Sequence, residues 1–124
     1  MFEIDQAEVS ELEGTVIVRG WYVMRGQDNA MLDKKLLLKN MTSNEIYEIG
    51  IYPMLRYDVE ALFQEDAKKV YSGTKNVTLA GIQCIVDKKM LESGTYQIGI
   101  QVDTGKHLWL SRKICWKKDC IINV

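Results

Sequence analysis

The stretch Thr95-Tyr96-Gln97-Ile98-Gly99-Ile100-Gln101-Val102-Asp103 alternates apolar and polar residues along its whole length. Successive side chains of a β-strand point to opposite faces, so one face of this segment is apolar. The pattern predicts a half-buried strand over 95–103. Thr104-Gly105 then predicts a tight two-residue hairpin turn, with a returning strand over 106–115.

The segment just before this strand predicts a corner. Asp87 is a suitable cap for one helical turn, and Gly94 can end that turn in a left-handed conformation. The spacing of Leu91, Gly94 and Tyr96 is typical of a tyrosine corner, in which the hydroxyl bonds to upstream backbone of an immunoglobulin-like sandwich. We therefore expect an immunoglobulin-like Greek-key topology.

Strand-like segments also occupy most of the remaining chain. The pattern predicts an all-β sandwich of about seven to nine strands in a single domain over 1–124. Further strands are expected at 4–9, 15–24, 32–39, 45–52 and 77–86, with an edge strand at 120–124 and a minor one at Val70-Tyr71. Over 55–63 the apolar spacing instead predicts a short helix that plugs one end of the sandwich, with a stripe of Leu55, Val59, Leu62 and Phe63.

The charge balance argues against nucleic acid as a partner. The 16 basic and 17 acidic residues give a net charge of −1, and lysine pairs are spread along the chain. The first residues do not resemble a signal peptide, and we expect no membrane-spanning segment. The 3 cysteines have no paired spacing, so we expect reduced thiols and a cytoplasmic location.

Candidate catalytic groups are few. His107 is the only histidine, and with Cys84 or Cys115 it could form a thiolate–base pair of a hydrolase or transferase. The alternative, a surface histidine and small buried thiols, is favoured. Asp58 and Glu60 are neighbouring residues on the one expected helix and do not face each other across a cleft. We expect no catalytic site, no metal and no cofactor.

The aromatic residues give the most specific binding hypothesis. Trp109 is expected to share an outward face with His107 and Ser111, beside Gln97 and Gln101 of the neighbouring strand. Such a shelf would suit a saccharide or a protein partner, because tryptophan often anchors interfaces. The favoured alternative is a Trp109 that other parts of the chain cover. Trp21 is expected to be covered, and Trp116 to pack against the C-terminal tail.

Three segments together resemble a known family. They are Arg56-Tyr57-Asp58-Val59, Gly81-Ile82, and the corner from Leu91 to Ile98. Their order is similar to that of β-sandwich accessory domains attached to bacterial glycosyltransferases and teichoic-acid-type glycerophosphotransferases, which carry Arg-x-Asp-Val, Gly-Phe and Leu-x-x-Gly-x-Tyr elements. The resemblance covers about Val16 to Ile114, and Ile82 departs from the family's phenylalanine.

The resemblance implies a non-catalytic accessory or protein-interaction domain associated with cell-surface polysaccharide synthesis, since the transferase chemistry belongs to a separate domain. A carbohydrate-binding module is the first alternative. No catalytic residue carries over. Arg56 and Asp58 match the family element, and we expect them to hold the short helix to the sandwich through charged hydrogen bonds. If the pair is buried, loss of one partner should cost several kcal/mol.

Overall fold

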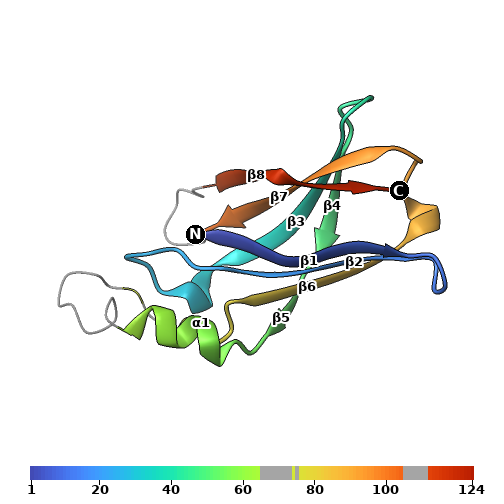
Figure 1. Cartoon of the computed structure of the whole chain (residues 1–124). Coiled ribbons are helices and arrows are strands. Elements are labelled where there is room, and N and C mark those ends of the chain that lie inside the picture. Colours follow the sequence, from blue (N-terminus) through green and yellow to red (C-terminus); the bar gives the residue numbers. More distant parts are fainter. Residues whose placement is uncertain (65–73, 75, 105–111) are drawn as a thin grey trace.

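The computed structural model describes residues 1–64, 74, 76–104 and 112–124, in which two antiparallel sheets face each other (Figure 1). One sheet has the strand order β1-β2-β6-β5 and the other the order β4-β3-β7-β8. The strands of the first sheet are β1 (Phe2–Ser10), β2 (Thr15–Tyr22), β6 (Gly81–Asp87) and β5 (Tyr52–Met54). Those of the second are β4 (Ile46–Gly50), β3 (Asp33–Asn40), β7 (Thr95–Asp103) and β8 (Arg112–Asn123). The structure confirms the prediction of a mostly-β, sandwich-like domain with one short helix.

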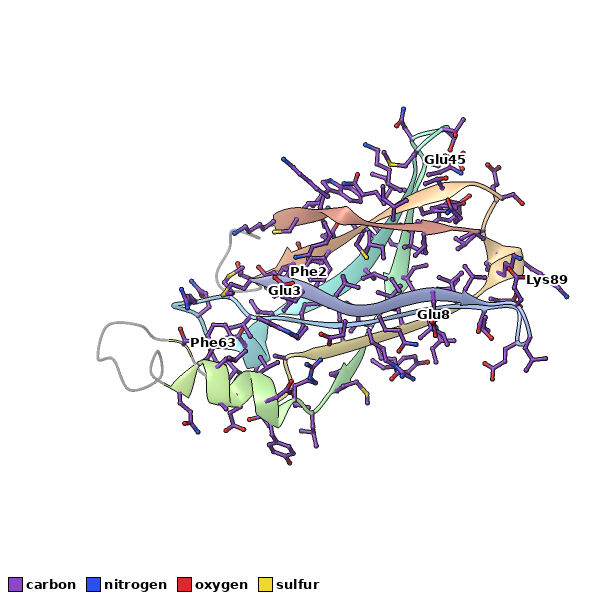
Figure 2. All side chains as sticks on the ribbon, in the orientation of Figure 1. Phe2, Glu3, Glu8, Glu45, Phe63 and Lys89 are labelled. Atoms are coloured by element: carbon purple, nitrogen blue, oxygen red, sulfur yellow. The ribbon has the colours of Figure 1, made fainter. Side chains whose placement is uncertain are left out.

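The main core lies between the two sheets, where side chains fill the interior (Figure 2). Alternate residues of the central strands point inward, as the period of two predicts. Burial of their apolar surface supplies most of the folding free energy, at about 25 cal/mol per Å². The fully buried members include Val16, Val18, Leu36, Leu38, Ile98 and Ile100.

The chain changes sheets between β4 and β5. Ile51 joins Gly50, the last residue of β4, to Tyr52, the first residue of β5. On the opposite side of the sandwich β1 and β8 run next to each other (Figure 1). There Lys117 donates from Nζ to the carbonyl oxygen of Phe2 at 2.9 Å and pairs with Glu3 at 3.2 Å.

The helix α1 (Tyr57–Leu62) forms, but it does not plug the main core as predicted. It packs instead against the outward side of β2, where Val59, Phe63, Trp21 and Val23 form a second small core. The rings of Trp21 and Phe63 meet edge to face, 5.9 Å between centroids. Trp21 is thereby covered, as predicted. Leu55 and Leu62 are exposed, so the predicted four-residue stripe is wrong at both of these positions.

Several boundaries differ from the sequence prediction. The sequence predicts a separate edge strand at 120–124, but these residues belong to the end of β8. The pairing of β8 with β7 shifts register between Gln97 and Ile98, and β8 continues beyond this shift. The strand predicted over 45–52 includes only the first residue of β5, because Pro53 interrupts the pattern of strand-forming residues. Two short 3-10 turns, η1 (Asn29–Met31) and η2 (Lys88–Met90), complete the described part. The minor strand predicted at Val70-Tyr71 lies outside the described residues.

Candidate interaction surfaces

The outer face of β7 carries Gln97, Gly99 and Gln101, as the alternation predicts. Among the described residues, the aromatic side chain on this face is that of Trp116 in β8, which pairs with Gly99. A Cβ atom on Gly99 would lie 2.5 Å from Cε3 of Trp116, so the indole lies directly on the glycine. The predicted companions Trp109, His107 and Ser111 lie outside the described residues. Trp116 therefore supplies an indole on the face where the sequence predicts Trp109.

The centre of this outer face is closed. Gln101 is only 4% exposed and Leu37 of β3 only 2%. Gln101 is therefore not available to a ligand, whereas Gln97 is half-buried. The ammonium of Lys39 lies 5.7 Å from the centroid of a Trp116 ring, within reach of a cation–π interaction. The more open apolar side chains lie toward the two edges, at Ile46, Ile114 and Ile121.

The corner before β7 has the geometry expected of a tyrosine corner. Tyr96 is fully buried, and its hydroxyl donates to the carbonyl oxygen of Glu92 at 2.7 Å. Gly94 has φ of +153°, a value that residues with a Cβ rarely adopt. Its backbone N–H and C=O exchange hydrogen bonds with Val124 of the C-terminal end, at 2.9 and 2.8 Å. The corner thus ties the start of β7 to the end of β8, and Leu91 is buried beneath it.

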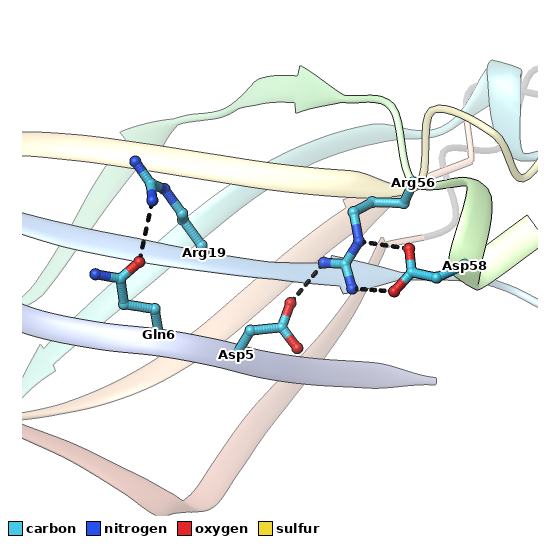
Figure 3. A network of polar contacts seen from close by, with 5 residues as sticks. All are labelled: Asp5, Gln6, Arg19, Arg56 and Asp58. Carbon is cyan, nitrogen blue, oxygen red and sulfur yellow. Dashed lines mark hydrogen bonds and ion pairs between the residues drawn. The ribbon is translucent and has the colours of Figure 1, made fainter.

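Arg56 is the centre of a charged cluster between β1 and α1 (Figure 3). Its Nε and Nη2 donate to the two carboxylate oxygens of Asp58 at 2.9 and 2.8 Å, and Nη1 donates to Asp5 at 2.5 Å. The hydrogen bonds from Arg56 lower the pKa of Asp58 to about 2. The same two carboxylates raise the pKa of Arg56. The cluster holds the start of α1 against β1, as the charged-hydrogen-bond hypothesis expects.

The Arg56–Asp58 pair is too exposed for the loss of one partner to cost several kcal/mol of stability. The side chain of Asp58 is 67% exposed and that of Arg56 is 24% exposed. Water therefore screens the pair, and partly exposed ion pairs contribute far less to stability than buried ones. The several kcal/mol that burial would imply do not apply here.

A bulge in β1 and a glycine in β6 make room for the cluster, and a glycine in β2 lies against the bulge. Asp5 lies at the register shift between Ile4 and Gln6 of β1, and bulges commonly redirect a side chain in this way. A Cβ on Gly20 of the facing strand would collide with the carbonyl oxygen of Glu3. A Cβ on Gly81 would lie 2.6 Å from Cγ of Arg56. Two of the three segments that carry the family resemblance, Arg56 to Val59 and Gly81-Ile82, therefore meet at Arg56.

Exposed apolar side chains flank Arg56 on both sides of it in the chain. We define the ridge as Tyr52, Met54, Leu55, Tyr57 and Leu62, which come from β5, α1 and the link between them. Tyr57 is 67% and Leu62 68% exposed. A hollow of about 370 Å³ adjoins the ridge and is lined by Met54, Leu55, Arg56 and Arg19 among others. Sequence reasoning missed this surface, because it assigned Leu55 and Leu62 to the core.

The thiol–histidine hypothesis finds no support at Cys84. Its side chain is fully buried, and Sγ donates to the carbonyl oxygen of Gly50 at 3.5 Å. Burial raises the pKa of Cys84 to about 12, whereas a nucleophilic cysteine needs a lowered pKa. Burial also raises the pKa of Cys120. His107 lies outside the described residues.

Within the described ranges, no three histidine, cysteine or carboxylate side chains are grouped closely enough to hold a metal ion. No helix in the same part of the chain is long and apolar enough to cross a membrane. Comparisons with models of protein families, with curated proteins and with solved structures gave no match. The surfaces above are therefore the basis for a functional proposal.

Proposed function

We propose that this chain is a non-catalytic accessory domain that docks onto another protein domain beside enzymes of bacterial cell-surface polysaccharide synthesis. The observation that carries the proposal is the apolar ridge next to the Arg56 cluster. Several large apolar side chains are exposed within one short segment on both sides of Arg56, and tyrosine, methionine and arginine are typical of interfaces. The meeting of two resemblance segments at Arg56 supports the link to the transferase-associated family.

The arrangement also favours binding at low entropic cost. The bidentate contact between Arg56 and Asp58 links the residues on both sides of Tyr57. A surface that is already ordered loses less conformational freedom when a partner binds. Tyr57 and Tyr52 are therefore suited to act as anchors, with Leu55 and Leu62 completing the apolar contact.

The topology proposal belongs with this function. In the immunoglobulin constant-type arrangement the strands A, B, E and D form one sheet and C, F and G the other. The order β1-β2-β6-β5 corresponds to A-B-E-D, and β3-β7-β8 corresponds to C-F-G with β4 as an added C′ strand. The Tyr96 corner lies at the start of the strand that corresponds to F. We infer an immunoglobulin-like Greek-key sandwich.

The docking proposal is tested with affinity-tagged domain and extract of its native host, followed by mass spectrometry. We expect a glycosyltransferase or glycerophosphotransferase to be retained by the wild type and lost by the double variant Tyr57→Ser/Leu62→Ser. The variant Leu12→Ser is the matched control, because Leu12 is 97% exposed in the β1–β2 turn, outside the ridge. Retention of no such enzyme, or equal retention by the ridge variant, would contradict the proposal.

Saccharide binding is the second candidate, and Trp116 is the observation that favours it. An indole supported from below by Gly99, with Lys39 beside it, is a surface on which a sugar ring could stack. A glycan-array screen of the wild type, Trp116→Ala and Trp109→Ala tests this candidate. Signal that depends on one of these tryptophans would favour a carbohydrate-binding module, and an array without specific signal would exclude it for the glycans tested.

A further inference from the structure

Among the edge strands of the described residues, β4 carries the fewest of the usual protections. Proteins guard sheet edges with lysine, proline, bulges, short strands or a covering element. β5 is only three residues long and contains Pro53. β1 and β8 each contain a register shift and lie against each other. By contrast, the sequence of β4, Ile46-Tyr47-Glu48-Ile49-Gly50, has neither lysine nor proline, and its register with β3 is unbroken.

The open edge of β4 presents backbone hydrogen-bonding groups. Asn40 donates from its N–H to the carbonyl oxygen of Glu45 at 2.8 Å. In this antiparallel register the N–H and C=O of Tyr47 and Ile49 also point toward β3. The alternate residues Ile46, Glu48 and Gly50 direct theirs to the open side. The contact from the thiol of Cys84 to the carbonyl oxygen of Gly50 fits this assignment, because Cys84 lies on that side.

A groove runs beside this edge. Its volume is about 410 Å³, and it lies between β4 on one side and β6 with η2 on the other. The groove is lined by apolar side chains that include Tyr47, Ile49, Ile85, Met90 and Leu91. β5 pairs with β6 only as far as Gln83, so the second wall of the groove is uncovered as well. An added strand could point alternate side chains into this space.

The charges of the groove indicate the chemistry of the occupant. Its charged lining residues are Glu48 and Asp87, both acidic. Lys35 is the described partner of Glu48, at 3.6 Å from the neighbouring strand β3. A second copy of this chain complements the acidic edge poorly, because the symmetric antiparallel register centred on this strand's middle residue would place Glu48 opposite Glu48. Like charges directly opposite each other destabilise a strand pair.

We infer that β4 takes up an extended segment of a different protein as an additional strand of its sheet. The segment has apolar residues at alternate positions, which enter the groove, and lysine or arginine opposite Glu48. The turn that contains Glu45, labelled in Figure 2, leads into this strand. The site is separate from the ridge, so variants of Tyr57 and Leu62 leave it unchanged, and the two proposals can fail independently.

The test is a selection of random ten-residue peptides displayed on phage, with the wild-type domain as bait. We expect enrichment of sequences that alternate apolar residues and contain lysine or arginine. The selected peptides are then synthesised with and without N-methyl groups on alternate backbone nitrogens. N-methylation on the edge that pairs with β4 should weaken binding at least tenfold, because it removes the ladder hydrogen bonds.

Two variants of β4 sharpen the test. Glu48→Pro removes an N–H that points to the open side and leaves the ladder to β3 intact, so it should abolish binding while circular dichroism stays unchanged. Glu48→Lys, which does not depend on tolerance of proline, should weaken binding of the basic peptides at least fivefold. Glu13→Lys, in the exposed β1–β2 turn, is the control for the change of charge.

Three outcomes would overturn the inference. They are recovery of the same peptides on Glu48→Lys as on the wild type, equal binding of N-methylated and unmodified peptides, and no enrichment at all. Concentration-dependent dimerisation that Glu48→Lys or Glu48→Pro removes would instead identify a second copy as the occupant, and would also overturn the proposal of a different partner.

Discussion

At the scale of single residues, the side chains with the most specific roles each connect distant parts of the chain. Tyr96 joins β7 to the backbone before the corner, and Arg56 joins the start of α1 to β1. Gly20, Gly81 and Gly99 have no Cβ because another residue occupies that space. Function and stability at these positions can therefore be tested by substitutions that change only one or two atoms.

Tyr96→Phe removes the hydroxyl that bonds to Glu92 and leaves the buried ring in place. We expect a loss of about 1 kcal/mol in the free energy of unfolding, the typical net contribution of one hydrogen bond. Urea denaturation measures this value. Tyr47→Phe is the control, because the Tyr47 hydroxyl bonds to the exposed Glu45 at 3.3 Å and its loss should change little. An unchanged midpoint for Tyr96→Phe would refute the structural role of the corner.

The Asp58 carboxylate predicts a pH dependence in the acid range. Its pKa is about 2 in the folded protein because Arg56 donates to it, against an ordinary value of 3.8. A lowered folded pKa stabilises the fold above the unfolded pKa, and this contribution is lost as pH falls from about 4 through 2. NMR titration should give the low pKa. In thermal unfolding between pH 4 and 2, Asp58→Asn should lose stability less steeply than the wild type. Parallel curves would contradict the assignment.

At the scale of elements, α1 is attached to the sandwich through a narrow contact. Val59 and Phe63, four residues apart, are buried, while Leu62 between them is exposed. The helix has six residues, too few to be stable alone, so its order depends on the contact with Trp21 and on Arg56. The ridge depends on the same contact, since Tyr57 and Leu62 belong to this helix.

Phe63→Ala should lower the free energy of unfolding by about 3–5 kcal/mol, as truncation of a buried aromatic residue usually does. Leu62→Ala is the matched control and should stay within about 0.5 kcal/mol of the wild type, because Leu62 is exposed. Chemical denaturation followed by tryptophan fluorescence measures both, since Trp21 lies against Phe63. Similar values for the two variants would mean that α1 does not pack on β2 as described.

The sequence pattern predicts the elements in which buried residues recur at a strict period. It does not predict positions that depend on how two elements pack against each other. The strand 95–103 was predicted with the bounds that β7 has, because its alternation is unbroken. The position of Trp116 on Gly99 depends on the register between β7 and β8, which alternation alone does not give. A glycine inside a strand opposite an aromatic residue was the available signal. The sequence does not reveal the ridge, because apolar residues at helical spacing give the same pattern whether all of their side chains or only half of them are buried.

At the scale of the whole molecule, the two sheets enclose one main core, and Cys84 lies inside it. Its thiol can meet a reagent only when the sheets separate or β6 detaches. Cys115 and Cys120 are only partly buried. The three thiols therefore report on different extents of opening.

In a Cys115→Ser/Cys120→Ser variant, alkylation of Cys84 should require global unfolding. We expect the labelling rate at pH 8 and low denaturant to match the rate calculated from the global unfolding equilibrium. Burial, which raises the pKa to about 12, further suppresses the thiolate. Iodoacetamide labelling followed by mass spectrometry measures the rate. Labelling much faster than global unfolding would show that the β4–β6 side opens on its own.

The two chain ends lie at opposite ends of the sandwich, with β1 and β8 side by side between them (Figure 1). A pull applied to both ends would run along the strands and would load the contacts between them in shear, many at once, rather than peel them apart singly. Arrangements of this kind resist extension well, and the lifetime under load is set by the unfolding rate. Placed in series with other domains, this sandwich would act as a stiff spacer that transmits tension without lengthening.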